Sequence, residues 1–358
     1  MLAVKVPLKG INEVKNILIK INLLNKYYKI KTDGNYGLIA IKTPKNLENL
    51  ENKINENLKM SKIKDLNKST VKIENIGMEP FKKEPRSLSE QLKGKLNEDE
   101  IKYLKTSFDI IGDLVLLEIP KNLEKHKEVI GNACIDFTNT KSAFMKKSGI
   151  KGVIRTREIE RIAGEDNSRT IAKEHGVKIS LDLKQVYFSP RLATERKRVE
   201  KQAKNGEKIL DMFTGVGPLP ILIAKNKNVE IYGVDINKIA IEYFKENIKI
   251  NKLNDHIYPI FGDINDVALK FKEKGLKFNR IIMNLPETAY KFLDLSIYLL
   301  SDNGILHYYE FSGDYEILIN RIKQIAIIYN REIEVLNMRK VKSSSPGRWI
   351  MGVDVKIK

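Results

Sequence analysis

The chain has little of several features that mark particular protein classes. Cys134 is its single cysteine, so no intramolecular disulfide can form and a reducing compartment is expected. No apolar run approaches the roughly 20 residues that a membrane-spanning helix needs, and residues 1–10 lack the apolar core of a secretory signal. The four histidines are scattered without metal-ligand spacing. These absences predict a cytoplasmic protein with no membrane partner and no metal.

What the chain does have is an excess of positive charge. It carries 64 Lys and Arg against 46 Asp and Glu, a net charge of +18. Such an excess favours a polyanionic partner, most often a nucleic acid, although a solvated lysine-rich surface is the alternative. The excess is +10 over residues 1–95, +5 over 96–205 and +3 over 206–358. This gradient predicts a polyanion-binding front and a different module behind it.

The length suggests two or three domains. The front part indicates short strands at 3–6 and 37–41 around a helix at 11–23, and Pro80, Pro85 and the polar stretch 87–90 indicate a linker. Alternating apolar residues predict further strands within 108–120, at 178–183 and at 186–188. We therefore expect an N-terminal domain at 1–84, a linker at 85–95, a middle domain at 96–190 and a last domain at 191–358.

From Glu207 onward, strand and helix patterns alternate. Strands are expected at 208–213, 229–235, 257–262, 278–284, 304–311, 332–341 and 348–357, with helices near 218–226, 237–251, 288–300 and 314–329. This alternation predicts a mostly parallel, doubly wound sheet. The short connection at 342–347 leaves no room for a helix, so the last two strands should form an antiparallel hairpin. The predicted fold class is an α/β class I methyltransferase, a Rossmann-like sheet with a C-terminal hairpin, preceded by two smaller α+β domains.

Three carboxylates end three successive predicted strands. Asp211 precedes the glycines Gly215 and Gly217, and Asp235 and Asp263 follow the next two strands. Asp235 stands 20 residues after Gly215, the spacing at which an acidic residue accepts hydrogen bonds from ribose hydroxyls. Pro220 replaces the third glycine of the dinucleotide fingerprint. The pattern therefore favours S-adenosylmethionine over NAD.

The fourth strand ends in Asn284-Leu285-Pro286. Amino-methyltransferases place an Asn/Asp-Pro-Pro-Tyr motif here, whose polar side chain and rigid carbonyls hold a planar nitrogen nucleophile. A plain turn capped by Asn and Pro is the alternative. The position, on a sheet whose first strand leads into Gly-x-Gly, favours the functional interpretation.

Residues 184–204 carry seven Lys or Arg against two Glu, with Tyr187 and Phe188 near their start. Cations beside aromatic rings suit nucleic acid, although a solvated helix face could carry the same charge. The predicted RNA-binding residues are Arg157, Arg191, Arg196, Lys197 and Arg198.

Taken in order, these motifs resemble the archaeal and eukaryotic tRNA (guanine-37-N1)-methyltransferases. The resemblance rests on 154–157 (Ile-Arg-Thr-Arg), 162–165, 187–192 (Tyr-Phe-Ser-Pro-Arg-Leu), 195–196, 211–218, 283–286 and 307–309. It covers 96–358 closely and the N-terminal domain more loosely. It implies a monomer whose N-terminal domain checks the outer corner of tRNA while the anticodon loop meets the catalytic domain. Glu287 and Tyr290 depart from the family pattern, in which Lys and His are frequent at these positions.

The resemblance also implies residue roles. Glu195 matches the general base for the guanine N1 proton, Arg155 the group at guanine O6, and Tyr187 an aromatic beside cofactor and base; Asn284 completes the predicted catalytic set. The expected cofactor site comprises Asp211, Phe213, Gly215, Gly217, Asp235, Ile236, Asp263, Ile264, Asn284 and Pro286. The chemistry agrees, because N1 is protonated at neutral pH and its removal places negative charge on O6. A glutamate among cations should have a low pKa, which partial burial would have to raise.

Three alternatives stay open at this point. The enzyme could also methylate C7 of the tricyclic wyosine precursor 4-demethylwyosine at the same tRNA position. It could be another RNA or protein amide methyltransferase. It could also be a non-catalytic tRNA-binding protein, an alternative that the intact cofactor carboxylates disfavour.

Overall fold

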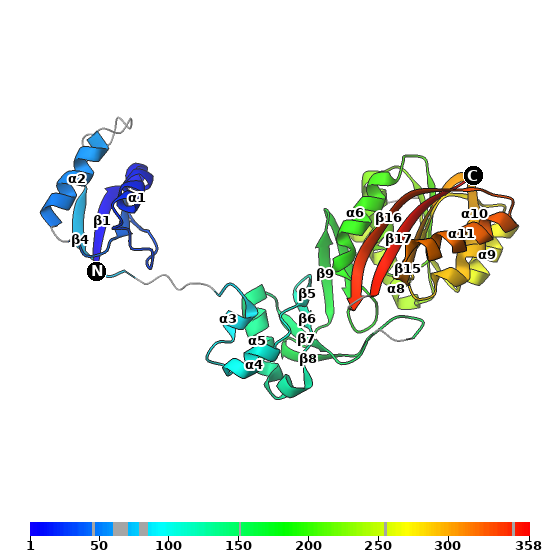
Figure 1. The fold of residues 1–358 in the computed structure, drawn as a ribbon, viewed down its shortest axis with the longest axis horizontal. Helices are drawn as coiled ribbons and strands as arrows, with labels where there is room; N and C mark the ends of the chain where they lie inside the picture. The colour runs from blue at the N-terminus through cyan, green and yellow to red at the C-terminus, as the bar shows by residue number, and fades with distance from the viewer. Residues whose placement is uncertain (45–46, 60–70, 79–84, 150–151, 254–255, 346–347) are drawn as a thin grey trace. The chain divides into compact units, whose positions relative to one another are not determined.

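The computed structural model describes residues 1–44, 47–59, 71–78, 85–149, 152–253, 256–345 and 348–358 (Figure 1). The chain divides into two compact units, Met1–Pro85 and Arg86–Lys358. Pro80, part of the expected linker, lies outside the described residues. Within those ranges, no helix is both long enough and apolar enough to cross a bilayer.

The first unit is an antiparallel four-stranded sheet with two helices. Its elements are β1 (Leu2–Pro7), η1 (Leu8–Gly10), α1 (Ile11–Lys20), β2 (Lys31–Asp33), β3 (Tyr36–Ala40), α2 (Leu47–Lys59) and β4 (Lys72–Asn75), and the strand order is β2-β3-β1-β4. Alternate residues of β1, such as Val4, pack against Val14 and Leu18 of α1. The predicted helix extends too far, because Asn22 adopts a left-handed conformation (φ 54°) just beyond α1.

The second unit begins with a mixed sheet and three helices. Its elements are α3 (Leu88–Gln91), α4 (Glu98–Tyr103), β5 (Phe108–Ile111), β6 (Leu114–Leu117), η3 (Lys121–His126), α5 (Lys127–Thr138), β7 (Ser142–Lys146) and β8 (Ile159–Gly164), with the sheet in the order β5-β6-β7-β8. Leu88, Leu92 and Leu96 are buried in the core of this part. Residues 86–95, which we expected to be a linker, therefore belong to the second unit.

A separate hairpin, β9 (Arg169–Glu174) and β10 (Val177–Asp182), joins this part to the last sheet. Buried Asn247 accepts a hydrogen bond from the Ser180 backbone N–H (2.7 Å) and donates to the Ser180 and Val216 carbonyls (3.1 and 2.9 Å). The predicted strand at 186–188 is wrong. The chain turns there, and the N–H of Val186 donates to the Asp182 carbonyl. Val186 and Phe188 are both buried in the core, so the alternation of apolar residues reflects their burial without a strand.

The last part is a seven-stranded sheet in the order β13-β12-β11-β14-β15-β17-β16. Its strands are β11 (Lys208–Asp211), β12 (Glu230–Asp235), β13 (Ile257–Phe261), β14 (Phe278–Met283), β15 (Leu300–Ser312), β16 (Ile333–Ser345) and β17 (Arg348–Ile357). The first five run parallel and β17 is antiparallel to both neighbours, which confirms the predicted doubly wound sheet and hairpin. Residues 346–347 of the expected connection lie outside the described ranges.

Helices flank this sheet. They are η4 (Pro190–Leu192), α6 (Ala193–Gln202), α7 (Pro218–Asn226), α8 (Lys238–Ile250), α9 (Ile264–Glu273), η5 (Ala289–Phe292), α10 (Leu293–Leu299) and α11 (Tyr315–Ile328). The sequence patterns missed α9, although its Asp263 accepts the N-cap hydrogen bond from the Asn265 N–H (2.8 Å).

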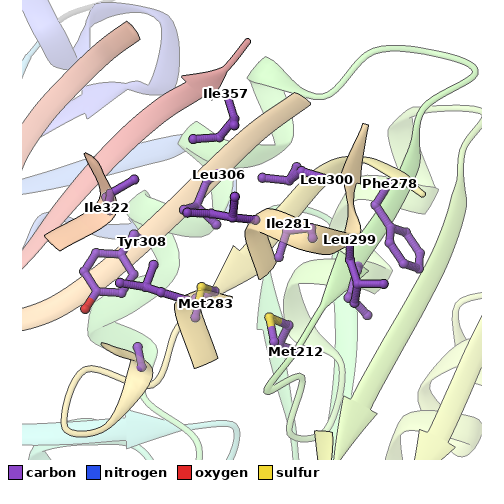
Figure 2. Close-up of a cluster of buried hydrophobic side chains, with 14 of the residues drawn as sticks. Met212, Phe278, Ile281, Met283, Leu299, Leu300, Leu306, Tyr308, Ile322 and Ile357 are labelled. Carbon is purple, nitrogen blue, oxygen red and sulfur yellow. The ribbon is translucent and has the colours of Figure 1, made fainter. Parts of the chain in front are cut away.

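The largest core lies between this sheet and helices α9, α10 and α11 (Figure 2). Ile281 of β14, Leu306 of β15 and Ile322 of α11 are fully buried in it. Met212 and Met283 belong to the same core. Met212 directly follows β11, and Met283 is the last residue of β14. The packed core therefore fixes the strand ends from which the functional loops start.

Candidate active site

The carboxyl ends of β11, β12 and β14 border a cavity of about 520 Å³. The predicted residues that line it are Arg155, Tyr187, Arg196, Phe213, Gly215, Asp235, Ile236, Asp263, Ile264, Asn284 and Pro286. This is the edge where an open α/β sheet binds its ligand. Of the predicted catalytic and cofactor residues, three do not line the cavity: Asp211, Gly217 and Glu195.

The loop after β11 has its shape because two glycines take left-handed conformations. Gly215 has φ 56° and Gly217 has φ 76°. A Cβ at Gly217 would lie 2.0 Å from the Phe244 ring, whereas one at Gly215 would meet nothing closer than 4.0 Å. Gly217 therefore allows the loop to pack on α8, and it shapes the loop without lining the cavity itself.

Asp235 ties this loop to the end of β12. Its carboxylate accepts hydrogen bonds from the backbone N–H groups of Gly215 (2.7 Å) and Asn237 (2.8 Å). Burial raises the pKa of Asp235. A carboxylate has about four acceptor positions, so two remain for ligand hydroxyls in the cavity that Asp235 lines.

Asp211 lies just beneath the cavity and is almost fully buried. Burial raises the pKa of Asp211 to about 7, the negative charge of Asp235 adds to the shift, and a hydrogen bond from the Phe213 N–H opposes it. Neither carboxylate forms an ion pair with a described residue, so together they form a site that a positively charged ligand would stabilise. The sulfonium and ammonium groups of S-adenosylmethionine fit this requirement.

The rim at the end of β14 is held by its own backbone. The Pro286 carbonyl accepts from the Phe311 N–H (3.1 Å), and the Leu285 carbonyl accepts from the N–H groups of Thr288 and Ala289 (3.1 and 2.9 Å). The two acceptor positions of the Leu285 carbonyl are therefore filled by the protein, contrary to the role expected for the rim carbonyls, whereas the Pro286 carbonyl keeps one acceptor position. The Asn284 side chain lines the cavity and has no hydrogen-bond partner among the described residues, so it remains available to a ligand.

Arg155 stands at the mouth of the cavity in a left-handed backbone conformation, φ 57°. Its guanidinium lies over the Tyr187 ring, 5.3 Å from the centroid, and its Nη1 is 3.3 Å from the Glu287 carboxylate. A non-glycine residue with positive φ stores strain and is frequent at functional sites.

A second cavity of about 570 Å³ adjoins the first and shares Arg155, Tyr187 and Glu287 with it. Its basic lining residues are Lys105, Lys146, Lys147, Arg155, Arg157, Arg191 and Lys342. Burial lowers the pKa of Lys342, and neighbouring cations such as Arg191 lower it further. Three carboxylates, Asp109, Glu118 and Glu287, also line it and pair with four of the cations. The seven basic residues outnumber them, so this basic cleft suits an anionic ligand.

The five predicted RNA-binding residues divide into two groups. Arg157 and Arg191 line the basic cleft. Arg196 is instead buried and forms a bidentate pair with Glu174 (2.6 and 2.5 Å). Lys197 pairs with Glu200 (2.7 Å) on its own helix, and Arg198 faces inward. For Arg196 and Arg198 the role in RNA binding is corrected, because buried carboxylates already occupy their guanidinium groups.

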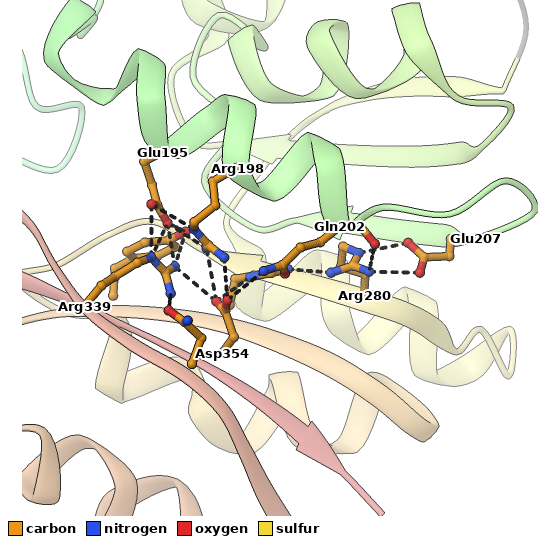
Figure 3. Close-up of polar contacts among 10 residues, drawn as sticks. Glu195, Arg198, Gln202, Glu207, Arg280, Arg339 and Asp354 are labelled. Carbon is orange, nitrogen blue, oxygen red and sulfur yellow. Dashed lines mark hydrogen bonds and ion pairs between the residues drawn. The ribbon is translucent and has the colours of Figure 1, made fainter.

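Glu195 does not line the cavity; its carboxylate contacts Tyr309 of β15 and Arg339 of β16, and Figure 3 shows it beside Arg198 and Arg339. Its carboxylate accepts from Arg198 (2.8 and 3.0 Å), from Arg339 (2.5 Å) and from the Tyr309 hydroxyl (2.6 Å). Burial alone would raise the pKa of Glu195, but these donors hold it at about 2. Glu195 therefore has the low pKa expected of a glutamate among cations, and its burial does not raise that pKa back to the usual range.

Several residues of the site were missed from the sequence. Arg339 and Asp354 contact the Glu195 cluster, and Lys342 lines the basic cleft. They lie about 150 positions after Glu195, and no local pattern marks them. Among the described residues, no three His, Cys, Asp or Glu side chains gather where they could hold a metal ion.

The sheet order and the cavity at its carboxyl edge define a class I methyltransferase. Family profiles described as "TRM5/TYW2 methyltransferase domain", "TYW2 N-terminal domain" and "tRNA methyltransferase 5 N-terminal domain" match residues 170–336, 88–167 and 3–46.

Individual relatives agree. The chain is 38% identical to the tRNA (guanine(37)-N(1))-methyltransferase Trm5b of Pyrococcus abyssi, over 99% of both chains. It is 31% identical to the tRNA 4-demethylwyosine(37)-methyltransferase Taw21 of Saccharolobus solfataricus, over 69% of this chain and 92% of the relative. The solved complex of aTrm5 and tRNALeu superposes with a TM-score of 0.79 at 35% identity, covering 100% of each chain. The protein belongs to the Trm5/TYW2 methyltransferase family, which confirms the predicted family and fold.

Proposed function

We propose that this protein transfers a methyl group from S-adenosylmethionine to N1 of guanosine 37 in tRNA. The observation that carries the proposal is the junction of the two cavities at Arg155 and Tyr187. One cavity has the carboxylates and glycine loop that suit the cofactor, and the other has the cations that suit an RNA backbone. A base held at the junction would meet both.

The cofactor supplies an electrophilic methyl group on a sulfonium. The protein's own residues prepare the nucleophile. Glu195 takes the N1 proton, Arg155 stabilises the negative charge that moves to O6, and Tyr187 stacks against the base. N1 then forms a bond to the methyl carbon as the bond from that carbon to sulfur breaks. Asn284 orients the base at the rim.

The finer roles extend this proposal. The first unit, within the most basic third of the sequence, binds the outer corner of the tRNA, while the basic cleft holds the anticodon loop. The enzyme acts as a monomer and without a metal. The full-length match to Trm5b supports methylation of guanine N1, since the match to Taw21 covers 69% of this chain. Methylation of C7 of 4-demethylwyosine remains the alternative activity.

The test is methyl transfer to unmodified tRNA transcripts that carry guanosine or adenosine at position 37, with the product nucleoside identified by mass spectrometry. We expect 1-methylguanosine from the first transcript and no product from the second. Equal methylation of both transcripts would contradict the assignment. A third arm, tRNA bearing 4-demethylwyosine, distinguishes single from dual specificity.

A further inference from the structure

Glu195, the proposed base, is bound to other side chains of the protein and must leave them before it can take a proton. Glu195 Oε1 accepts from Arg198 Nη2, Arg339 Nε and Nη2 and the Tyr309 hydroxyl, and Oε2 accepts from the Nε of both arginines. A carboxylate offers about four acceptor positions. No position is left for a guanine N1–H, and Glu195 is not among the residues that line the cavity.

Asp354 of β17 forms the fixed side of this cluster (Figure 3). It is fully buried and accepts from Arg198 (2.6 Å), from Arg339 (3.1 Å) and from Gln202 (3.3 Å). It also contacts His307 Nδ1 at 2.7 Å. The neighbouring cations and His307 hold the pKa of Asp354 far below its usual range, so the carboxylate is ionised.

Asp354 is in turn anchored through His307. Arg280 Nη1 lies 2.6 Å from His307 Nε2, and because a guanidinium only donates, Nε2 must accept and Nδ1–H must donate to Asp354. Burial lowers the pKa of His307, consistent with the neutral ring. Arg280 is itself held by Glu207 at 2.8 and 2.9 Å. Asp354 therefore cannot follow Glu195 when Glu195 moves.

Arg339, unlike Asp354, lies where the backbone can shift. It lies on β16, the outermost strand, whose pairing register with β17 shifts on both sides of it, between Val335 and Asn337 and between Lys340 and Lys342. Arg198, in contrast, is on the same helix as Glu195 and can move with it. Release of Glu195 toward the cavity therefore requires its bonds to Arg339 to break.

We propose that Arg339 is a positioning residue that holds Glu195 withdrawn until the target base arrives, and that Asp354 retains Arg339 when Glu195 turns to the base. Two guanidinium groups, of Arg198 and Arg339, face two carboxylates in the closed cluster. When Glu195 leaves, Asp354 still balances one of the two positive charges, which limits the energetic penalty of opening. The inference rests on the proposed role of Glu195 as the base.

The experiment measures kcat/KM for a guanosine-37 transcript between pH 5 and 8.5 in the full-length enzyme. The groups that surround Glu195 are Arg198 on α6, Tyr309 and His307 on β15, Arg339 on β16 and Asp354 on β17. Because kcat/KM reports groups of the free enzyme, wild type should show no loss assignable to Glu195 down to pH 5. Arg339→Gln removes a cation from a buried carboxylate, so an acidic limb should appear within the measured range.

Two variants serve as controls for Arg339→Gln. Arg339→Lys keeps the charge and should restore the wild-type profile. Lys340→Gln removes a cation from the next position on β16 and should leave the profile unchanged. Melting curves and S-adenosylmethionine affinity verify that each variant is folded. A profile for Arg339→Gln that superposes on wild type would overturn the inference.

Asp354→Asn supplies an independent arm. Without the Asp354 charge, both arginines bind Glu195 more firmly, so single-turnover rates should fall about ten-fold at every pH with no new acidic limb. A rate equal to wild type would refute the role of Asp354. Glu195→Gln separates the two proposals. If Glu195→Gln keeps the wild-type rate, the base assignment fails. If Glu195→Gln is inactive and Arg339→Gln has the wild-type pH profile, only the positioning role of Arg339 fails.

Discussion

The guanidinium of Arg155 lies 3.3 Å from the carboxylate of Glu287, at the junction of the cofactor cavity and the basic cleft. Arg155 is the group proposed to stabilise guanine O6, so without a bound base its charge is shared with Glu287. The side chain of Glu287 is half exposed, and a pair of this kind contributes at most about 1 kcal/mol.

Glu287→Gln should therefore raise kcat/KM for the guanosine-37 transcript, by up to about five-fold, because guanine no longer competes for Arg155. The measurement is initial rates at subsaturating tRNA. Glu242→Gln, an exposed glutamate on α8, is the matched control. A lower kcat/KM for Glu287→Gln would mean that Glu287 assists the base instead of competing with it.

Arg155→Lys should lower the single-turnover rate by about 100-fold, since one lysine cannot reproduce the directed donors of a guanidinium at a developing oxyanion. Affinity for S-adenosylmethionine should not change. Arg157→Lys, in the basic cleft only, should alter tRNA affinity more than the rate. Equal rate losses in the two variants would assign Arg155 to general RNA binding.

The affinity for S-adenosylmethionine should rise with pH between 6 and 8. The pKa of Asp211 is about 7 in the unliganded protein, and a bound cation should lower it, so binding releases a proton. Calorimetry in buffers of different ionisation enthalpy measures that proton directly. Asp211→Asn should remove the pH dependence, and a flat affinity for wild type would show that Asp211 does not sense the ligand.

The same carboxyl makes a prediction about stability. Its folded pKa lies above the unfolded value of about 3.9, so the stability it contributes is fully present below that value and is lost as pH rises through 7. The melting temperature of unliganded wild type should fall relative to Asp211→Asn as the pH rises from 5 to 8. A constant difference between the two proteins would contradict this.

Gly217→Ala should destabilise the cofactor loop more than Gly215→Ala. Both positions have positive φ, which strains alanine by about 1 kcal/mol or more. Only at Gly217 would the added Cβ also clash with the Phe244 ring, at 2.0 Å. Thermal unfolding and cofactor affinity measure both variants, and equal losses would show that the contact with Phe244 is relieved by local movement.

Much of the last sheet was predictable from the sequence, because buried parallel strands and amphipathic helices alternate with clear periods. Asp235 and Asn284 were predictable for the same reason, as they follow strands whose ends must share one edge. The directions of Glu195, Arg196 and Arg198 were not predictable. They depend on Asp354, Glu174 and Arg339, which come from other elements and are brought close only by the tertiary fold.

The segment 86–95 shows the opposite error. Its polar composition suggested a linker, but Leu88 and Leu92 are four positions apart and bury one helical face. Four helical residues are too few for a periodic signal to stand out against the charged residues around them.

The most direct test of the account is the single-turnover rate of Glu195→Gln, with its tRNA affinity measured alongside. Glutamine keeps the shape and can still accept from Arg198 and Arg339, but it cannot take the N1 proton. We predict a rate loss of about 100-fold or more with tRNA affinity within a factor of about three. A wild-type rate, or equal losses of rate and affinity, would contradict the assignment of Glu195 as the base.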